Sequence, residues 1–159
     1  MIDAPPPRLV VGAAGRERGR VAPVSTRLIA AALCLGGLAL LLVSAGLTPD
    51  ETGHGTHTQL SMPPCTWAET FDKPCMTCGM TTSFALAADG NLLDSARTQP
   101  FGFILVLLVA AIVWGAGLVA LTGSMLGEAL GRMLTARVLW VALGLLLAAW
   151  AYTFVTWEV

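Results

Sequence analysis

The sequence predicts an all-α integral membrane protein with three transmembrane helices and a short membrane-surface helix or helical hairpin in the first external loop. Composition is the first reason. Hydrophobic residues make up 55% of the 159 residues and charged residues 12%, about half the share usual in soluble proteins. The second reason is length, because three uncharged segments can cross a hydrocarbon core about 30 Å thick: 28–47, 101–121 and 138–155.

The order of segments follows from these spans and from the composition between them. Within the expected external loop, helical patterns indicate two short helices at 79–89 and 91–98. The complete expected order is a flexible Arg-rich cytoplasmic tail at 1–26, transmembrane helix 27–48, an external Cys/His loop at 49–99, transmembrane helix 100–122, a cytoplasmic connecting helix at 123–137, transmembrane helix 138–156 and an external end at 157–159.

The distribution of basic residues predicts the orientation in the membrane. Five arginines precede the first span, and Arg132 and Arg137 lie between the second and third spans. The loop between the first two spans has only Lys73 and Arg97. Because cytoplasmic segments are enriched in Lys and Arg, we expect the N-terminus inside and both the Cys-bearing loop and the C-terminus outside.

The first span also has an alternative interpretation. An Arg-rich start, an apolar run and the sequence Val43-Ser44-Ala45 are typical of a signal peptide cleaved after Ala45. The apolar run is long for a signal peptide and the basic leader is extended. We therefore expect an uncleaved membrane anchor.

Proline and glycine determine where helices are expected outside the spans. The prolines and glycines between residues 48 and 74 exclude a long regular element, so this part is expected to be an irregular loop. Met80, Phe84 and Ala88 then share one helical face, and Pro100 is a favoured start for the second span. In the cytoplasmic connection, glycines at four-residue spacing predict close helix packing and a protein partner: Gly123, Gly127 and Gly131.

The strongest chemical signal is a group of thiols and imidazoles in the external loop. Both histidines of the chain, His54 and His57, and three of its four cysteines, Cys65, Cys75 and Cys78, lie there. Zinc prefers four Cys and His ligands, so a Cys3His site is one interpretation, and nearby methionines would also suit copper(I). All five residues are candidate metal ligands. Cys34 lies inside the first span, where a lone cysteine is usually a small packing residue.

Two other interpretations of the same cysteines stay open. An oxidising compartment favours a disulfide from Cys65 to Cys75 or Cys78, worth about 3 kcal/mol by loop closure. Alternatively, Cys75 and Cys78 could exchange disulfides, because a helix beginning near Gly79 would favour a thiolate. A c-type haem is excluded because Gly79 stands where a histidine is needed, and the chain has no phosphate-binding loop or hydrolase motif.

These residues resemble the domain-of-unknown-function 2752 family of small bacterial membrane proteins. The resemblance covers about residues 50–125 and depends on Cys65, the run Cys75 to Thr82, Gly90-Asn91 and Gln99-Pro100. Where the family has Pro, Arg, Asp and Asn, this chain has Met76, Thr82, Asn91 and Gln99, respectively. The resemblance implies the architecture, the cysteine positions and a bacterial inner membrane, and it implies no reaction.

The sequence therefore predicts a non-enzymatic membrane protein whose external Cys/His cluster is a structural metal site or a disulfide staple. Zinc is the expected ion and copper the alternative. Membrane lipid and protein partners in a membrane complex are expected, whereas no catalytic residue, nucleic-acid partner or small-molecule substrate is indicated. The alternative function is a membrane thiol-disulfide oxidoreductase or copper-handling protein that uses the CxxC pair.

Overall fold

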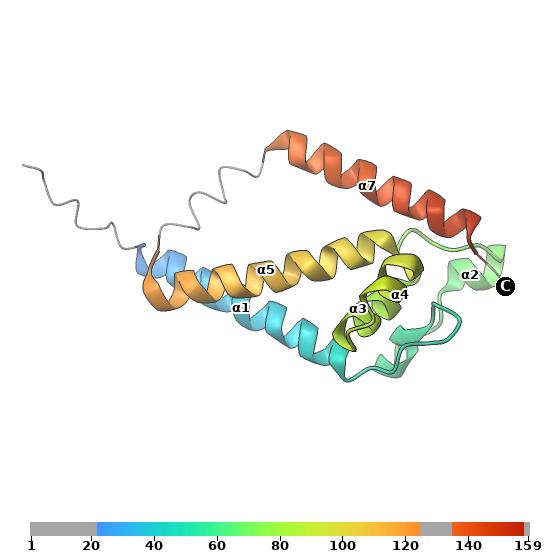
Figure 1. The fold of residues 1–159 in the computed structure, drawn as a ribbon, viewed down its shortest axis with the longest axis horizontal. Helices are drawn as coiled ribbons and strands as arrows, with labels where there is room; N and C mark the ends of the chain where they lie inside the picture. Colours follow the sequence, from blue (N-terminus) through green and yellow to red (C-terminus); the bar gives the residue numbers. More distant parts are fainter. Residues whose placement is uncertain (1–21, 125–134, 158–159) are drawn as a thin grey trace, which may run out of the picture.

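A computed structural model describes residues 22–124 and 135–157, and within these ranges every regular element is a helix (Figure 1). Three helices are long and apolar enough to cross a membrane. The predicted fold class is therefore confirmed. The elements in order are α1 (Val24–Ala45), the 3-10 helix η1 (Thr56–Leu60), α2 (Thr66–Phe71), α3 (Met80–Ala88), α4 (Leu92–Thr98), α5 (Pro100–Thr122) and α7 (Ala136–Val155).

The most extensive helix contact joins α1 to α5, which run side by side for most of their length (Figure 1). Gly37 permits this approach, because a Cβ atom added there would lie 2.7 Å from Cγ2 of Val113. At one end of the pair, the Arg27 guanidinium donates hydrogen bonds to the carbonyl oxygens of Ala120 and Leu121. A cation at the C-terminus of α5 also compensates the negative end of its helix dipole.

The segment expected to be an irregular loop contains two short helices. Both η1 and α2 are a single turn or slightly more, so they are compatible with the prolines and glycines that rule out a long element. The 3-10 helix η1 is fixed to α3 by a buried hydrogen bond of 2.8 Å between the hydroxyls of Thr56 and Thr82. By contrast, α2 buries none of its six residues.

Helices α3 and α4 form a hairpin that packs on the start of α5 (Figure 1). Two buried serines join its arms: Ser83 Oγ donates to the Ser95 carbonyl at 3.1 Å, and Ser95 Oγ donates to the Ser83 carbonyl at 2.7 Å. Gln99 then caps α5, since its side-chain oxygen accepts from the N–H groups of Phe101 and Gly102. These hydrogen bonds fix the hairpin to the N-terminal end of α5.

The connection expected as a helix over 123–137 lies mostly outside the described residues, including Gly127 and Gly131. At its described edge, Gly123 ends α5 in the left-handed conformation, with φ of 69°. Its carbonyl accepts the N–H of Ala22 at 2.8 Å, so the ends of α1 and α5 are joined there. Helix α7 lies apart from this pair and has only sparse contact with α5.

Candidate metal centre

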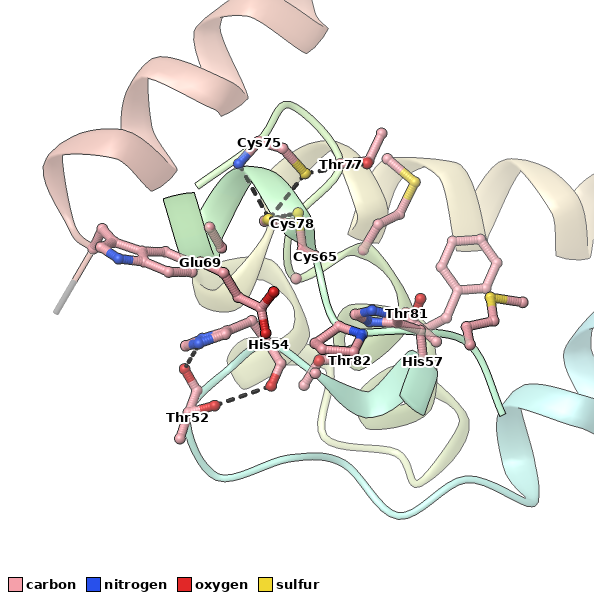
Figure 2. Close-up of a pocket in the computed structure, with 18 of the residues that line it drawn as sticks. Thr52, His54, His57, Cys65, Glu69, Cys75, Thr77, Cys78, Thr81 and Thr82 are labelled. Carbon is pink, nitrogen blue, oxygen red and sulfur yellow. Dashed lines mark hydrogen bonds between the residues drawn. The ribbon is translucent and has the colours of Figure 1, made fainter. Parts of the chain in front are cut away.

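Three cysteines from two separate segments converge at the end of the α1–α5 pair that lies opposite Arg27. Cys65 is the residue before α2, whereas Cys75 and Cys78 belong to the turn that leads into α3. Their sulfur atoms all lie within 4.8 Å of one another, and Figure 2 shows the three side chains pointing together. Cys34 lies in α1, and its sulfur is 3.4 Å from the place that a Cβ atom at Gly117 would take. The structure thus joins the three cysteines outside the spans that the sequence singles out.

The cysteine turn owes its shape to backbone hydrogen bonds and one glycine. The N–H of Cys78 donates to the Cys75 carbonyl at 3.2 Å, and the N–H of Met80 donates to the Thr77 carbonyl at 3.1 Å. Gly79 follows with φ of 81°, in the left-handed region that favours glycine. A Cβ atom at Gly79 would also lie 3.0 Å from the Gly53 carbonyl oxygen. This glycine therefore lets the turn end and α3 begin within one residue.

Hydrogen bonds to sulfur distinguish Cys75 from Cys78. Burial raises the pKa of the Cys75 thiol, but hydrogen bonds from Cys78 and Thr77 outweigh it and hold this pKa below the ordinary value. Burial and the hydrogen bond with Cys75 both raise the pKa of Cys78. Cys78 also accepts the N–H of Cys75 at 3.1 Å. The two thiols therefore differ in pKa, and Cys75 is the one that ionises first as the pH rises.

The distances between the sulfurs can be compared with two kinds of bonding. A tetrahedral zinc ion with Zn–S bonds of about 2.3 Å separates two of its sulfurs by roughly 3.8 Å. Cys65 and Cys78 are 3.7 Å apart, close to that separation. Cys75 and Cys78 are 2.9 Å apart, longer than a disulfide bond, and all four cysteines are free. The Cys65–Cys78 spacing fits an ion directly, and Cys75 would have to withdraw from Cys78 by roughly 1 Å.

The two histidines line the same cavity as the cysteines but do not join the sulfur group. His54 Nδ1 is 2.9 Å from the Thr52 carbonyl, and its ring lies 4.3 Å from the ring of Trp157. His57 belongs to η1. Figure 2 shows both imidazoles on the side of the cavity away from Cys75. The predicted histidine ligands are thus near the three sulfurs, and contact with an ion would require their side chains to move.

The cavity beside the sulfurs has a volume of about 1090 Å³ and a mixed lining. Its apolar lining includes Leu40 of α1 and Leu105 of α5. Three carboxylates, Glu51, Glu69 and Asp72, also line it, and none of the lysines and arginines in residues 22–124 and 135–157 does. Since carboxylates attract cations, this environment suits a metal ion better than an anionic ligand.

Residues far along the chain also hold the cysteine turn. Trp150 in α7 donates its Nε1–H to the carbonyl of Pro74 at 3.2 Å. The Lys73 ammonium lies 5.3 Å from the centroid of the Phe154 ring. The sequence gives no reason to connect Trp150 to residue 74. Their separation of 76 residues leaves no local pattern from which the contact could be inferred.

Fold and site together define an all-helical protein with three candidate membrane spans and a three-cysteine group outside them. Residues 65–113 match the family described as "Protein of unknown function (DUF2752)". This confirms the family resemblance, over a narrower range than 50–125, and the matched part holds all three clustered cysteines. No curated protein and no solved structure matches the chain.

Proposed function

We propose that this protein is a non-enzymatic membrane module in which Cys65, Cys75 and Cys78 hold one thiophilic metal ion, with zinc first and copper(I) the alternative. The convergence of three free sulfurs from two separate segments carries this proposal. Thiolates are favoured ligands of both ions. His54 and His57, which line the adjoining cavity, are the proposed sources of a fourth ligand.

A metal ion would hold α2 in place, which apolar contacts alone do little to achieve. Helix α2 buries none of its residues, and both Trp67 and Phe71 are more than half exposed. Cys65 stands at the start of this helix, so an ion shared with Cys75 and Cys78 would fix α2 to the α3–α4 hairpin. Structural zinc contributes about 10–16 kcal/mol in apparent binding free energy, ample to order a six-residue helix. A disulfide from Cys65 to the turn would have the same stapling effect.

We further propose that this site faces the outside of a bacterial inner membrane. Arginines flank the opposite ends of the spans, and Arg27 lies at that end of α1. The outer end of the molecule carries an excess of carboxylates instead. This placement follows the rule that Lys and Arg collect on the cytoplasmic side. Attachment to a larger membrane complex, as an accessory subunit, is part of the same proposal.

Metal analysis of the purified protein tests the proposed function. The full chain is isolated in detergent under reducing conditions, and zinc and copper are measured per chain together with the number of reactive thiols. We expect about one ion per chain, and its loss in Cys65→Ser. Cys34→Ser, which changes a cysteine in α1 outside the group, is the matched control and should keep the ion. A wild-type protein with no ion and four reactive thiols would refute the proposal.

A second function is favoured by the 2.9 Å separation and the polarity of the Cys75–Cys78 pair. In disulfide exchange, the Cys75 thiolate would attack a disulfide of a partner protein and release one partner thiolate. Cys78 would then attack the Cys75 sulfur of the mixed disulfide and displace the second partner thiolate, leaving the Cys75–Cys78 pair oxidised and both partner thiols reduced. Equilibration in glutathione buffers of graded potential tests this, because a redox pair loses two thiols over a narrow range of potential.

A further inference from the structure

Helix α7 reaches the cysteine turn through one aromatic face. Trp150 and Phe154 are four residues apart in α7, so they lie on the same side of the helix, and Trp157 follows two residues after its last residue, Val155. Each contacts the outer loop: Trp150 bonds the Pro74 carbonyl, Phe154 lies beneath Lys73, and Trp157 packs on His54. We name these three residues the aromatic face of α7.

This face is a principal attachment of α7. Contact between α7 and α5 is sparse, whereas α1 and α5 pack extensively. Apolar side chains give no hydrophobic driving force for helix association in lipid, because lipid tails are equally apolar. Specific polar and aromatic contacts then carry more of the association. The three contacts of the aromatic face are all directed at the cysteine turn or at His54.

The Trp150 hydrogen bond acts on the cysteine pair through a single peptide group. The Pro74 carbonyl and the Cys75 N–H are the two ends of one planar amide. Trp150 bonds the oxygen of this amide at 3.2 Å, and the N–H at the other end donates to Cys78 Sγ at 3.1 Å. Because the amide is rigid, fixing its oxygen fixes the direction in which its N–H points. The side chain of Pro74 is itself fully buried, so this group has little room to turn.

We propose that Trp150, supported by Phe154 and Trp157, is a positioning residue that holds the Pro74–Cys75 amide against the Cys78 sulfur. Removal of this contact leaves the three cysteines present but lets the turn adopt other conformations. Where an ion binds to the cysteines, as in the proposed function, its affinity is linked to the docking of α7. Linkage is reciprocal, so the ion must also strengthen that docking.

Two tryptophan substitutions on the same helix provide the test. Trp150→Phe keeps an aromatic ring and removes the N–H donor. Trp140→Phe is the matched control, because Trp140 is 72% exposed at the opposite end of α7. Cobalt(II) is titrated into each reduced protein in detergent, with the thiolate-to-cobalt absorption as the signal. We expect Trp150→Phe to bind about tenfold more weakly, the factor for a lost hydrogen bond of about 1.4 kcal/mol, and to shift the visible cobalt bands.

Hydrogen exchange of residues 73–79 separates this proposal from the proposed function. The exchange measurement needs no metal. The amides of residues 73–79 should exchange faster in Trp150→Phe than in both the wild type and Trp140→Phe. If the wild type binds no cobalt, the metal proposal fails while the exchange comparison still decides the positioning role. Exchange rates and cobalt bands in Trp150→Phe equal to those of the control would overturn the positioning role. Should Trp150→Phe not fold, Phe154→Leu, which removes the Lys73 contact, is compared in the same way and must also accelerate exchange.

Discussion

Gly79 and Gly90 have almost the same backbone conformation in very different surroundings. Their φ angles are 81° and 84°, respectively. A Cβ atom at Gly79 would lie 3.0 Å from the Gly53 carbonyl oxygen, whereas nothing lies within 4 Å of one at Gly90. An alanine in the left-handed conformation is strained by about 1–2 kcal/mol at either position. Only at Gly79 would its Cβ atom also crowd the Gly53 carbonyl oxygen.

We predict that Gly79→Ala destabilises the protein more than Gly90→Ala. The difference should be about 1 kcal/mol or more, because the Gly53 backbone would have to move away from the cysteine turn. Thermal unfolding of both variants in the same detergent measures it. Equal melting temperatures would show that the close contact between Gly79 and Gly53 contributes nothing.

The two cysteines of the turn should differ in reactivity. The pKa of Cys75 lies below the ordinary value and that of Cys78 above it, so at neutral pH Cys75 has the larger thiolate fraction. In metal-free, reduced protein we expect iodoacetamide to modify Cys75 about tenfold faster than Cys78, or more, since each unit of pKa difference changes the thiolate ratio tenfold. Timed alkylation followed by peptide mass spectrometry gives both rates, and Cys34→Ser removes a competing thiol. A faster reaction at Cys78 would contradict the assignment.

At the residue scale, residue type and spacing were enough to predict the sulfur group. Cys65, Cys75 and Cys78 lie within 14 residues, and Gly79 signals the end of the turn. The contact of Trp150 with Pro74 could not be predicted, because it depends on how a distant helix crosses the loop. The position of His54 is equally non-local, since it follows from packing on Trp157.

At the scale of elements, neighbouring glycines in α1 have opposite surroundings. Gly37 faces α5, with Cγ2 of Val113 only 2.7 Å from where a Cβ atom would stand. Gly36 has nothing within 4 Å. Both lie in the interior of the same helix, so the intrinsic gain from alanine, about 1 kcal/mol, applies equally to each.

We predict that Gly37→Ala weakens the α1–α5 pair and Gly36→Ala does not. Relative to Gly36→Ala, the cost of overpacking should be about 1–3 kcal/mol, because valine has little rotamer freedom with which to move aside. Thermal unfolding in detergent provides the comparison. A Gly37→Ala variant as stable as Gly36→Ala would mean that this helix contact is looser than described.

The length of the uncharged apolar segments identified the three long helices, since a run of about 20 such residues has few alternatives to crossing a membrane. The short helices η1 and α2 escaped prediction for the opposite reason. Elements of five and six residues are too brief to show a period, and tertiary contacts such as the Thr56–Thr82 hydrogen bond decide whether they form.

At the scale of the whole molecule, the chain has two chemically distinct ends. Arg27 and the α1–α5 junction lie at one end, and the sulfur group with its carboxylate-lined cavity lies at the other. An orientation in the membrane therefore assigns the sulfur group to one compartment. Its oxidation state depends on that assignment, because disulfides persist in oxidising compartments and thiols in the cytoplasm.

We predict that a membrane-impermeant maleimide reaches Cys65 from outside intact cells. The protein for this measurement retains Cys65 as its only cysteine. A second protein has its only cysteine at position 122, in place of Thr122 at the opposite end of α5. That cysteine should react only after the membrane is permeabilised. The reverse pattern would place the sulfur group in the cytoplasm and would contradict the proposed orientation.

The attachment of α7 near one end has a mechanical consequence. From Trp150 to its first residue, Ala136, α7 is about 21 Å long, so a change in tilt of about 10° moves its far end by roughly 4 Å. Transmembrane helices adjust their tilt to the thickness of the bilayer around them. With its pivot at Trp150 and Pro74, α7 would convert such a change into torque on the sulfur group. Where an ion binds to the cysteines, as proposed, lipid chain length thus becomes a variable of its affinity, and ion contents should be compared between samples of equal bilayer thickness.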